Sequence, residues 1–287
     1  AAGHREWFNP ADVDIERDER ARVVGARLRF DGQPVAIGGI EKMSKSKNNG
    51  VDPRAMVEKY GADTVRLFSM FAAPPEKSLE WNEAGVEGMA RFLRRLWRDA
   101  QAHIAQPADL VENRPPVDAA KLNPVQKALR RQIHETIAKV GDDYGRRLSF
   151  NTAIASAMEL LNAVGKFEDM SEQGRAVRHE AFETLVLVLN PITPHICHAL
   201  WLALGHRESL LDVAWPQADP GALVKAEVTL AVQVSGKLRG TIEVAVDAPR
   251  DVVENAALAH ADVAKFVGDA VPKKIVIVPG KIVNIVI

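Results

Sequence analysis

Two lysines and two serines lie close together near the start of the chain and are suited to binding phosphate groups. The string Lys42-Met43-Ser44-Lys45-Ser46 places two ammonium groups three residues apart, with hydroxyl groups beside them. Ammonium groups act as point charges toward phosphate oxygens, and hydroxyl groups add hydrogen bonds. An arbitrary pair of lysines at this spacing is more often part of a solvated loop. The coincidence of all five residue types favours a polyphosphate-binding loop instead.

The residues around this string predict the elements that hold it. Alternating apolar and basic residues favour strands over 22–30 and 33–37, joined by an Asp-Gly turn. Glycines on both sides of the polar stretch then predict a loop. An Asp-Pro pair predicts a helix over 53–60, and a second helix is expected over 63–71.

The middle of the chain has a helical period throughout. Asn82 is expected to cap one helix, and Asn123, Asn151 and Ser171 are expected to open three more, before a last helix that follows a pair of prolines. Residues 106–118 contain adjacent prolines and several acids, which predict a long loop between helices. One helix face is expected to be buried through Val86, Met89, Leu93, Leu96, Trp97, Ala100 and Ile104.

After residue 216 the period of the apolar residues changes from near 3.6 to 2. The new pattern predicts a hairpin of strands over 228–234 and 238–246, a helix over 251–266, and a second hairpin over 274–278 and 282–287. Together these elements predict a small α+β domain, near the lower size limit for a self-sufficient core.

The composition is that of an ordinary folded protein. The 287 residues are 47% hydrophobic and 26% charged, which excludes disorder and allows about two domains. Since 37 Lys and Arg residues balance 38 Asp and Glu residues, any contact with nucleic acid must come from a local basic face. The single cysteine, Cys197, cannot form an internal disulfide, no apolar run is long enough to span a bilayer, and the first ten residues include charges. We therefore expect a cytoplasmic protein.

The lysine string and its surroundings resemble a known family. Lys42 to Ser46 match the KMSKS signature of class I aminoacyl-tRNA synthetases. The longer strings KMSKSKNNGVDP, EKYGADTVRLFSMFAAPPEKSLEW, VQVSGKLRGTIEV and VPGKIVNIVI resemble bacterial leucyl-tRNA synthetases, so the resemblance covers essentially the whole chain. It implies a multidomain, mainly α protein. The expected parts are the end of a class I nucleotide-binding catalytic domain over 1–61, an antiparallel helical bundle of the anticodon-binding type over 62–221, and a small α+β C-terminal domain over 222–287.

The resemblance also implies a chemistry for the loop. The family activates leucine with ATP and Mg²⁺ and then transfers the leucyl group to tRNA-Leu. By this resemblance Lys42 and Lys45 are catalytic phosphate contacts, with more weight on Lys45. Ser44 and Ser46 hold the loop or donate to phosphate, while Met43 packs against the fold and anchors the loop. All five residues form the expected ATP-binding set.

Other features of the family do not occur in this sequence. No HIGH-type motif is present, and the editing insertion is also absent. The resemblance therefore implies the C-terminal portion of a synthetase, beginning just before the signature loop. We expect this portion to be inactive alone, to hold no tightly bound cofactor and to be monomeric.

Two groups of basic residues are candidates for tRNA binding. Four arginines fall on adjoining faces of one predicted helix, namely Arg91, Arg94, Arg95 and Arg98. Because Asp99 is the one acid close by on the C-terminal side, RNA contact is favoured over a solvated face. In the last domain Lys237 and Arg239 are expected at the first hairpin turn, and Lys273, Lys274 and Lys281 at the second. The family's C-terminal domain reaches the tRNA elbow, so RNA contact is expected there too.

Two further groups of residues are candidates for a role in the site. Asp63 and Arg66 resemble a family element under the loop, or else Asp63 caps a helix and Arg66 is a surface ion. His195, Cys197 and His198 invite a metal interpretation. On a helix, however, the cysteine points away from the two histidines, and zinc needs at least one more ligand. We therefore expect no metal site.

Two alternative functions stay open at this point. Another class I synthetase, of the valine, isoleucine or methionine group, shares the loop and the bundle. The sequence lacks the C-terminal coiled coil typical of the valine enzyme and the Cys-rich terminus typical of the isoleucine enzyme. The other alternative is a non-catalytic RNA-binding module.

Overall fold

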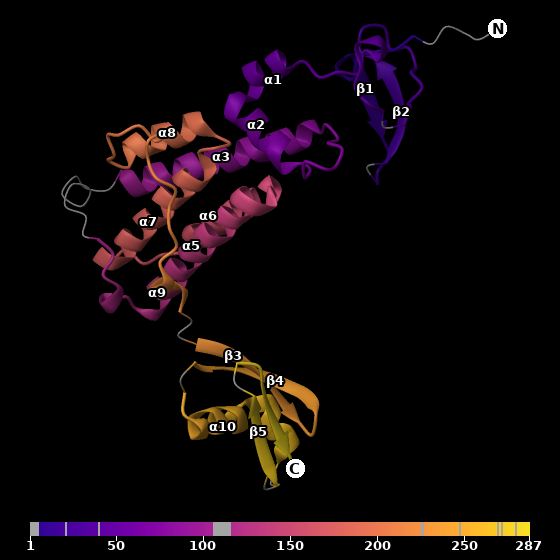
Figure 1. Ribbon diagram of the computed structural model, residues 1–287. Coiled ribbons are helices and arrows are strands. Elements are labelled where there is room, and N and C mark those ends of the chain that lie inside the picture. The colour runs from indigo at the N-terminus through magenta and orange to yellow at the C-terminus, as the bar shows by residue number, and fades with distance from the viewer. Residues whose placement is uncertain are drawn as a thin grey trace. The chain divides into compact units, whose positions relative to one another are not determined.

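The computed structural model divides into two compact units, Ala1–Gln217 and Ala218–Ile287 (Figure 1). The sequence predicts this boundary slightly later, between 221 and 222. It also predicts a boundary between 61 and 62, which stays a prediction. The residues that the structure describes are 6–20, 22–39, 41–105, 116–224, 227–246, 248–268, 270, 272–278 and 280–287.

The first unit begins with a two-stranded antiparallel sheet. Strand β1 (Val13–Arg17) pairs with β2 (Val23–Leu28), and Val13 lies opposite Leu28. The expected strand over 33–37 is wrong, because this stretch forms only an isolated bridge between Pro34 and β2. Proline has no N–H group to donate, so a ladder of hydrogen bonds cannot continue through it.

Three helices follow the lysine loop. Helix α1 (Pro53–Tyr60) begins with the predicted cap, since the Asp52 carboxylate accepts from the Arg54 N–H at 3.0 Å. Helix α2 (Ala62–Phe71) comes next, and α3 (Glu83–Ile104) begins at Asn82, which caps it as predicted. The caps satisfy backbone N–H groups that the first helical turn leaves without partners.

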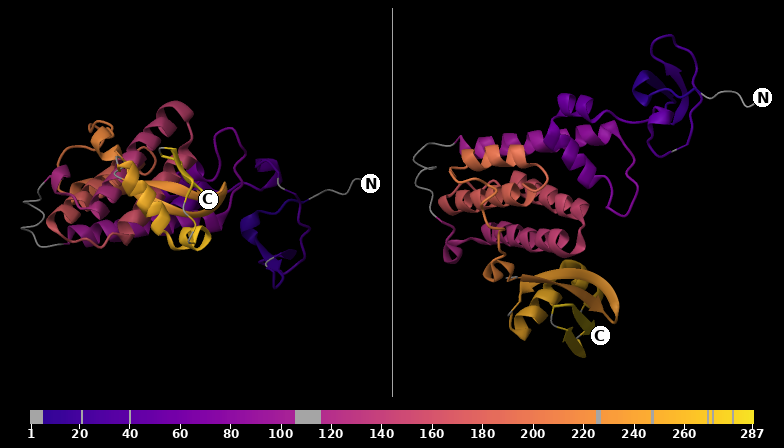
Figure 2. Two further views of the ribbon diagram at one scale, coloured as in Figure 1. Left: turned by 90° about the horizontal axis from the view of Figure 1, so that it is seen from below. Right: turned by 45° about the horizontal axis from the view of Figure 1, so that its top comes forward.

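Four more helices complete the bundle, which Figures 1 and 2 show packed side by side. They are α5 (Pro124–Asp142), α6 (Phe150–Lys166), α7 (Glu172–Leu189) and α8 (Pro194–Ala203). The predicted caps of α5 and α7 are present, and α5 has a full capping box. Fully buried side chains of the shared core include Leu96, Ile133, Ile154, Leu160, Phe182, Leu185 and Leu189.

Two expectations about the bundle are wrong. Helix α6 does not open at Asn151 but one residue earlier, after a π-helical turn (Asp143–Arg147) and a left-handed Leu148 with φ of 52°. The buried Asp143 carboxylate accepts from Thr152 Oγ1 at 2.7 Å, so it supports the helix start in place of a local cap. Trp97 is 41% exposed, whereas Val86, Met89, Leu93, Leu96 and Ala100 of the expected stripe are buried. Most of the expected loop over 106–118 lies outside the described residues.

The second unit is a four-stranded sheet with helices packed on it. After a short helix α9 (Pro220–Leu223), the strands are β3 (Glu227–Val234), β4 (Lys237–Ala245), β5 (Lys274–Val278) and β6 (Ile282–Val286). Their order is β4-β3-β6-β5, with β3 and β6 parallel and the other neighbours antiparallel. The core that stabilises the sheet contains Leu230, Val232, Val244, Val253, Val263, Val283 and Ile285.

The helix expected over 251–266 is interrupted. It forms two helices, α10 (Arg250–Ala259) and α11 (Ala261–Val267), with an extended His260 between them. The break lets Val253 and Ala257 of α10 and Val263 of α11 all reach the same core. Across the described part of the chain, no helix has both the length and the apolar composition that a membrane crossing needs.

Candidate functional site

The lysine loop is held by one asparagine. The Asn49 Oδ1 accepts from the Ser44 N–H at 2.8 Å, and the Asn49 Nδ2 donates to the Lys42 carbonyl at 3.3 Å. Between these contacts Lys45–Lys47 form a 3-10 turn, which ends at Asn48 with a φ of 45°. The hydroxyl oxygens of Ser44 and Ser46 lie 3.3 Å apart. The loop therefore has a defined shape, fixed by an amide that the sequence analysis did not single out.

The three lysines of the loop differ in their surroundings. Lys47 forms an ion pair with Glu41, and its Nζ lies 5.6 Å from the centroid of the Trp7 ring. Lys42 and Lys45 are exposed, and neither forms an ion pair with any residue that the structure describes. Their positive charges are thus available to an anion, while the charge of Lys47 is already balanced.

Met43 does not have the anchoring role that we expected. Its side chain is 45% exposed, so the thioether is not packed into the fold. The physical reason is that the loop is fixed through polar contacts: Asn49 spans it, and the Asn9 Nδ2 donates to the Gly50 carbonyl at 3.2 Å at its end.

The four arginines of α3 are divided between two hollows in the first unit. Arg91 and Arg94 line a hollow of about 1090 Å³, together with Trp97 and Tyr60. Arg95 and Arg98 line a different hollow of about 520 Å³, beside Arg178 and Lys166, which add two more cations. The arginines thus line two different hollows, and Arg98 in the second is paired with Asp99 at 2.8 Å.

The first hollow combines basic and aromatic groups. Arg91 lies 3.9 Å from Glu87, a long and exposed ion pair that costs little to break. The exposed Trp97 offers an aromatic face beside it, and such faces stack with bases or with sugar edges. The expectation that Trp97 is buried is therefore wrong, and no sequence pattern pointed to Tyr60 as part of a site.

Asp63 and Arg66 connect two helices and do not support the loop directly. The Asp63 carboxylate, only 8% exposed, accepts from the Ile196 N–H at 2.7 Å and lies 2.8 Å from the His195 Nδ1. Arg66 donates to the carbonyls of Ile192 at 2.8 Å and of Pro191 at 3.0 Å. We call these contacts the α2–α8 clamp. Asp63 therefore caps a helix, but the helix is α8 and not its own.

Replacing Asp63 with Ala should lower the free energy of unfolding by about 2–3 kcal/mol. The substitution removes charge-assisted hydrogen bonds and leaves a helix N–H group without its acceptor. Urea unfolding followed by circular dichroism measures the change. Asp212→Ala is the matched control, because Asp212 is exposed and such surface changes stay within about 0.5 kcal/mol. Equal stability of the two variants would contradict the clamp's role.

The three residues considered as a zinc site from the sequence, His195, Cys197 and His198, each have different surroundings. Cys197 is fully buried, and burial raises the pKa of its thiol to about 12. Its sulfur lies 3.4 Å from Thr193 Oγ1, while His195 is engaged by Asp63 and His198 is exposed. The three side chains do not converge on a common point, so packing and capping explain them.

The lysines of the second unit are grouped differently from our expectation. The pairing of β5 with β6 puts Lys274 opposite Val286, and Lys273 donates its N–H to the Val286 carbonyl. Because β3 runs parallel to β6, the β3–β4 turn that carries Lys237 lies at this same end of the sheet. Lys281 lies at the opposite end, beside Ala231. The prediction that Lys273 and Lys274 sit at the second turn is therefore wrong.

Arg239 has a different environment again. Its guanidinium carbon lies 3.6 Å from the centroid of the Phe266 ring, in a cation–π contact between β4 and α11. Part of its charge is thus directed at the domain's own aromatic ring, and Arg239 is only partly exposed. Lys237 is the freer cation of the pair.

Two family models match the chain. Residues 126–254 match the anticodon-binding domain of tRNA ligase, and residues 36–82, which include the lysine loop, match tRNA synthetases class I (I, L, M and V). Together with the helical bundle and the loop geometry, these matches define a class I tRNA synthetase fold with an anticodon-binding domain. The expected fold class is confirmed.

Relatives with high sequence identity all carry the same name. The chain is 68% identical over 285 residues to the leucine-tRNA ligase of Stenotrophomonas maltophilia strain K279a, and 65% identical to that of Xanthomonas axonopodis pv. citri strain 306. Each match covers 99% of this chain and 32% of the relative, so the chain spans about a third of the length of these relatives. The chain is therefore homologous to about a third of the length of these bacterial leucine-tRNA ligases. The resemblance seen in the sequence is confirmed.

A solved structure agrees with this assignment. The chain superposes on the Agrobacterium radiobacter K84 agnB2 LeuRS, solved as a ternary complex with tRNA and LeuAMS, with a TM-score of 0.71 and 27% identity. The match covers 85% of this chain and 31% of that chain.

Proposed function

We propose that the complete protein is a leucine-tRNA ligase, which forms leucyl-adenylate from leucine and ATP and transfers the leucyl group to tRNA-Leu. In this proposal the chain supplies the lysine loop and two tRNA-binding regions, and it acts as a monomer in the cytoplasm. The observation that carries the proposal is the loop itself, with Lys42 and Lys45 exposed and without ion pairs among the described residues. The exchange assay argued in the Discussion tests it.

The loop contributes to catalysis through charge. When the leucine carboxylate attacks the α-phosphorus of ATP, the bond to pyrophosphate breaks and negative charge moves onto the leaving oxygens. Ammonium groups that meet this charge as it develops lower the barrier and do more than tighten ATP binding. Lys42 and Lys45 are the groups in this segment that fit this role, and the hydroxyls of Ser44 and Ser46 add donors.

Mg²⁺ accompanies ATP in the family, and the loop fits the phosphates rather than the metal ion. Mg²⁺ prefers oxygen ligands, carboxylates above all. The nearest acid in the loop, Glu41, is already paired with Lys47. Mg²⁺, when bound, would supply neutralisation of phosphate charge, while Lys42 and Lys45 would bind the leaving group directly.

Two regions of the chain are proposed to bind tRNA. In the first unit, the hollow with Arg91 and Arg94 offers cations beside the exposed Trp97. Arg95 and Arg98 line the second hollow and are proposed as backbone contacts. In the second unit, the main proposed contact is the end of the sheet that carries Lys237, Lys273 and Lys274. Arg239 lies near this end, and Lys281 lies at the opposite end.

Neutralising Lys237 and Lys274 together should weaken tRNA binding and reduce its salt dependence by up to about two units of slope. Each lysine that contacts a phosphate releases about one counterion on binding. Filter binding of tRNA-Leu at several salt concentrations measures the slope. The double variant Lys237→Ala/Lys274→Ala should leave leucine activation in the complete enzyme unchanged.

Lys281→Ala provides the comparison, because Lys281 lies at the other end of the same sheet. A loss of about one unit of salt-dependence slope in this variant would show that tRNA contacts both ends of the sheet. A double variant with unchanged midpoint and slope would assign these lysines to a solvated surface, and the unit to structural support.

A further inference from the structure

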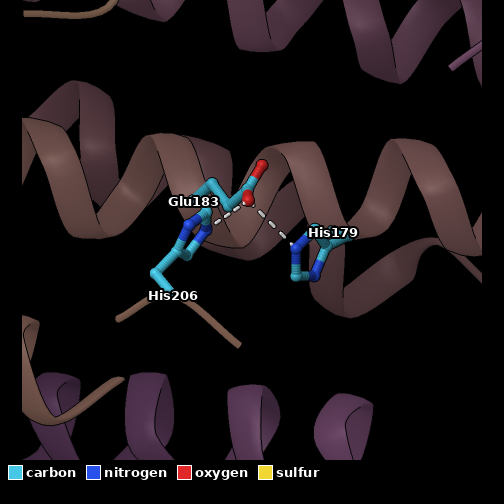
Figure 3. A group of neighbouring side chains, drawn as sticks. All are labelled: His179, Glu183 and His206. Atoms are coloured by element: carbon cyan, nitrogen blue, oxygen red, sulfur yellow. Dashed lines mark hydrogen bonds and ion pairs between the residues drawn. The ribbon is translucent and has the colours of Figure 1, made fainter. Parts of the chain in front are cut away.

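Three side chains outside the proposed tRNA and ATP sites converge in the bundle (Figure 3). His179 and Glu183 lie one turn apart on α7, and His206 follows the left-handed Gly205 after α8. The Nε2 of His179 lies 3.0 Å from Glu183 Oε1, and the Nε2 of His206 lies 2.6 Å from the same oxygen. Each side chain offers a ligand atom, and these atoms all lie within 4.8 Å of one another.

The imidazole rings of His179 and His206 also contact residues outside this group of three. Each turns its Nε2 inward and its Nδ1 outward, where the Nδ1 of His179 lies 3.3 Å from His103 Nε2 and that of His206 lies 3.5 Å from Glu208 Oε1. The His206 ring also stacks on Trp201, with centroids 3.5 Å apart and planes inclined by 4°. Outer partners of this kind orient the histidines that bind metals in proteins.

Both imidazoles approach the same carboxylate oxygen, Glu183 Oε1, so the three side chains already bring their possible ligand atoms together. A metal ion bound by the two inner Nε2 atoms leaves each ring proton on Nδ1. His206 can then donate to Glu208, and His179 can donate to His103.

We propose that His179, Glu183 and His206 bind one Zn²⁺ ion. Two imidazoles and one carboxylate are a common zinc ligand set, with a fourth position left for water. The side chains of these residues are 11%, 28% and 27% exposed, so solvent and metal can reach them. The ion would fasten the segment after α8 to α7.

This site differs from the metal candidate of the sequence analysis. The sequence candidate consisted of His195, Cys197 and His198, which lie within four residues of one another. His206 lies 23 residues from Glu183, so no spacing rule for short motifs joins them.

The test uses the 287-residue chain, freed of metal with EDTA. Titration with ZnCl₂ in a calorimeter should show one site per chain, and CoCl₂ should give the visible absorption of a histidine-bound cobalt ion. Zn²⁺ should also raise the melting temperature in a concentration-dependent way. Glu183→Gln and His206→Gln should each weaken Zn²⁺ binding by at least about 100-fold, and Glu208→Gln by about 10-fold, as expected for a ligand and for an outer partner.

His198→Gln is the matched control, because His198 is an exposed histidine of α8 outside the cluster. It should bind Zn²⁺ as the unaltered chain does. Circular dichroism of the metal-free variants shows whether each is folded. If one ligand variant does not fold, the other ligand variant and the cobalt spectrum of the unaltered chain still show whether the cluster binds a metal ion. Absence of a one-to-one zinc site, or equal affinity in the Glu183→Gln, His206→Gln and control variants, would overturn the proposal.

Discussion

Lys45→Ala in the complete ligase should slow leucine-dependent ATP–pyrophosphate exchange by about tenfold to a thousandfold, the range for losing one preorganised group that stabilises a transition state. The structure gives this expectation its basis. Lys45 begins the 3-10 turn that Asn49 and its contacts define, and its ammonium group has no ion-pair partner among the described residues. Its charge is therefore not committed before ATP arrives. The effect should fall on kcat more than on KM, because the interaction strengthens as charge develops.

Two other lysines make this test specific. Lys47→Ala should have a smaller effect than Lys45→Ala, since the Lys47 charge is already balanced by Glu41. Lys127→Ala, on the exposed side of α5, should leave exchange unchanged. Near-normal exchange in Lys45→Ala, or an equal loss in Lys127→Ala, would contradict the proposed role.

The second large effect concerns the chain by itself. The purified 287 residues should give no leucine-dependent ATP–pyrophosphate exchange above background. One cationic loop can meet the leaving pyrophosphate, but it does not hold the adenosine or the amino acid in line for attack, and that positioning contributes much of the rate. No HIGH-type string, which the family uses for this purpose, occurs in these residues.

The same preparation should still bind tRNA, which separates an inactive binder from an unfolded chain. Exchange measured on the complete ligase at equal concentration is the positive control. Robust exchange by the isolated residues would show that they hold a whole activation site. The proposal that the loop supplies only one part of that site would then be wrong.

Much of the helical fold could be predicted because its signals are local. Asp52, Asn82, Asn123 and Ser171 each cap the helix that follows, and each is recognisable from its own short stretch of sequence. Strand β1 was missed because its five residues, VDIER, are mostly charged. It forms a backbone ladder with β2, and exposed ion pairs add to the pairing: Arg27 of β2 lies 2.7 Å from Glu16, and Arg29, just after β2, lies 2.8 Å from Asp14.

For the candidate site, too, only the features that depend on local sequence could be predicted. Lys42 and Lys45 lie three residues apart, so the residue types of one short string are enough to propose them as phosphate contacts. The exposure of Met43 and Trp97 depends on which neighbours cover them, and a helical period cannot show that a face is left open. The grouping of Lys237 with Lys274 depends on the parallel pairing of β3 with β6, which no local pattern specifies.

The α2–α8 clamp also has a consequence for the order in which the first unit assembles. Asp63 and Ile196 are separated by 133 positions, and Arg66 and Ile192 by 126. Closing a chain loop of this length costs about 4 kcal/mol in entropy, so these contacts cannot form early unless the intervening helices have already drawn the ends together. The first turn of α8 therefore acquires its cap late, in a step that depends on a helix made long before it at the ribosome. A chain released before α8 would leave Asp63 as a carboxylate without the helix it caps.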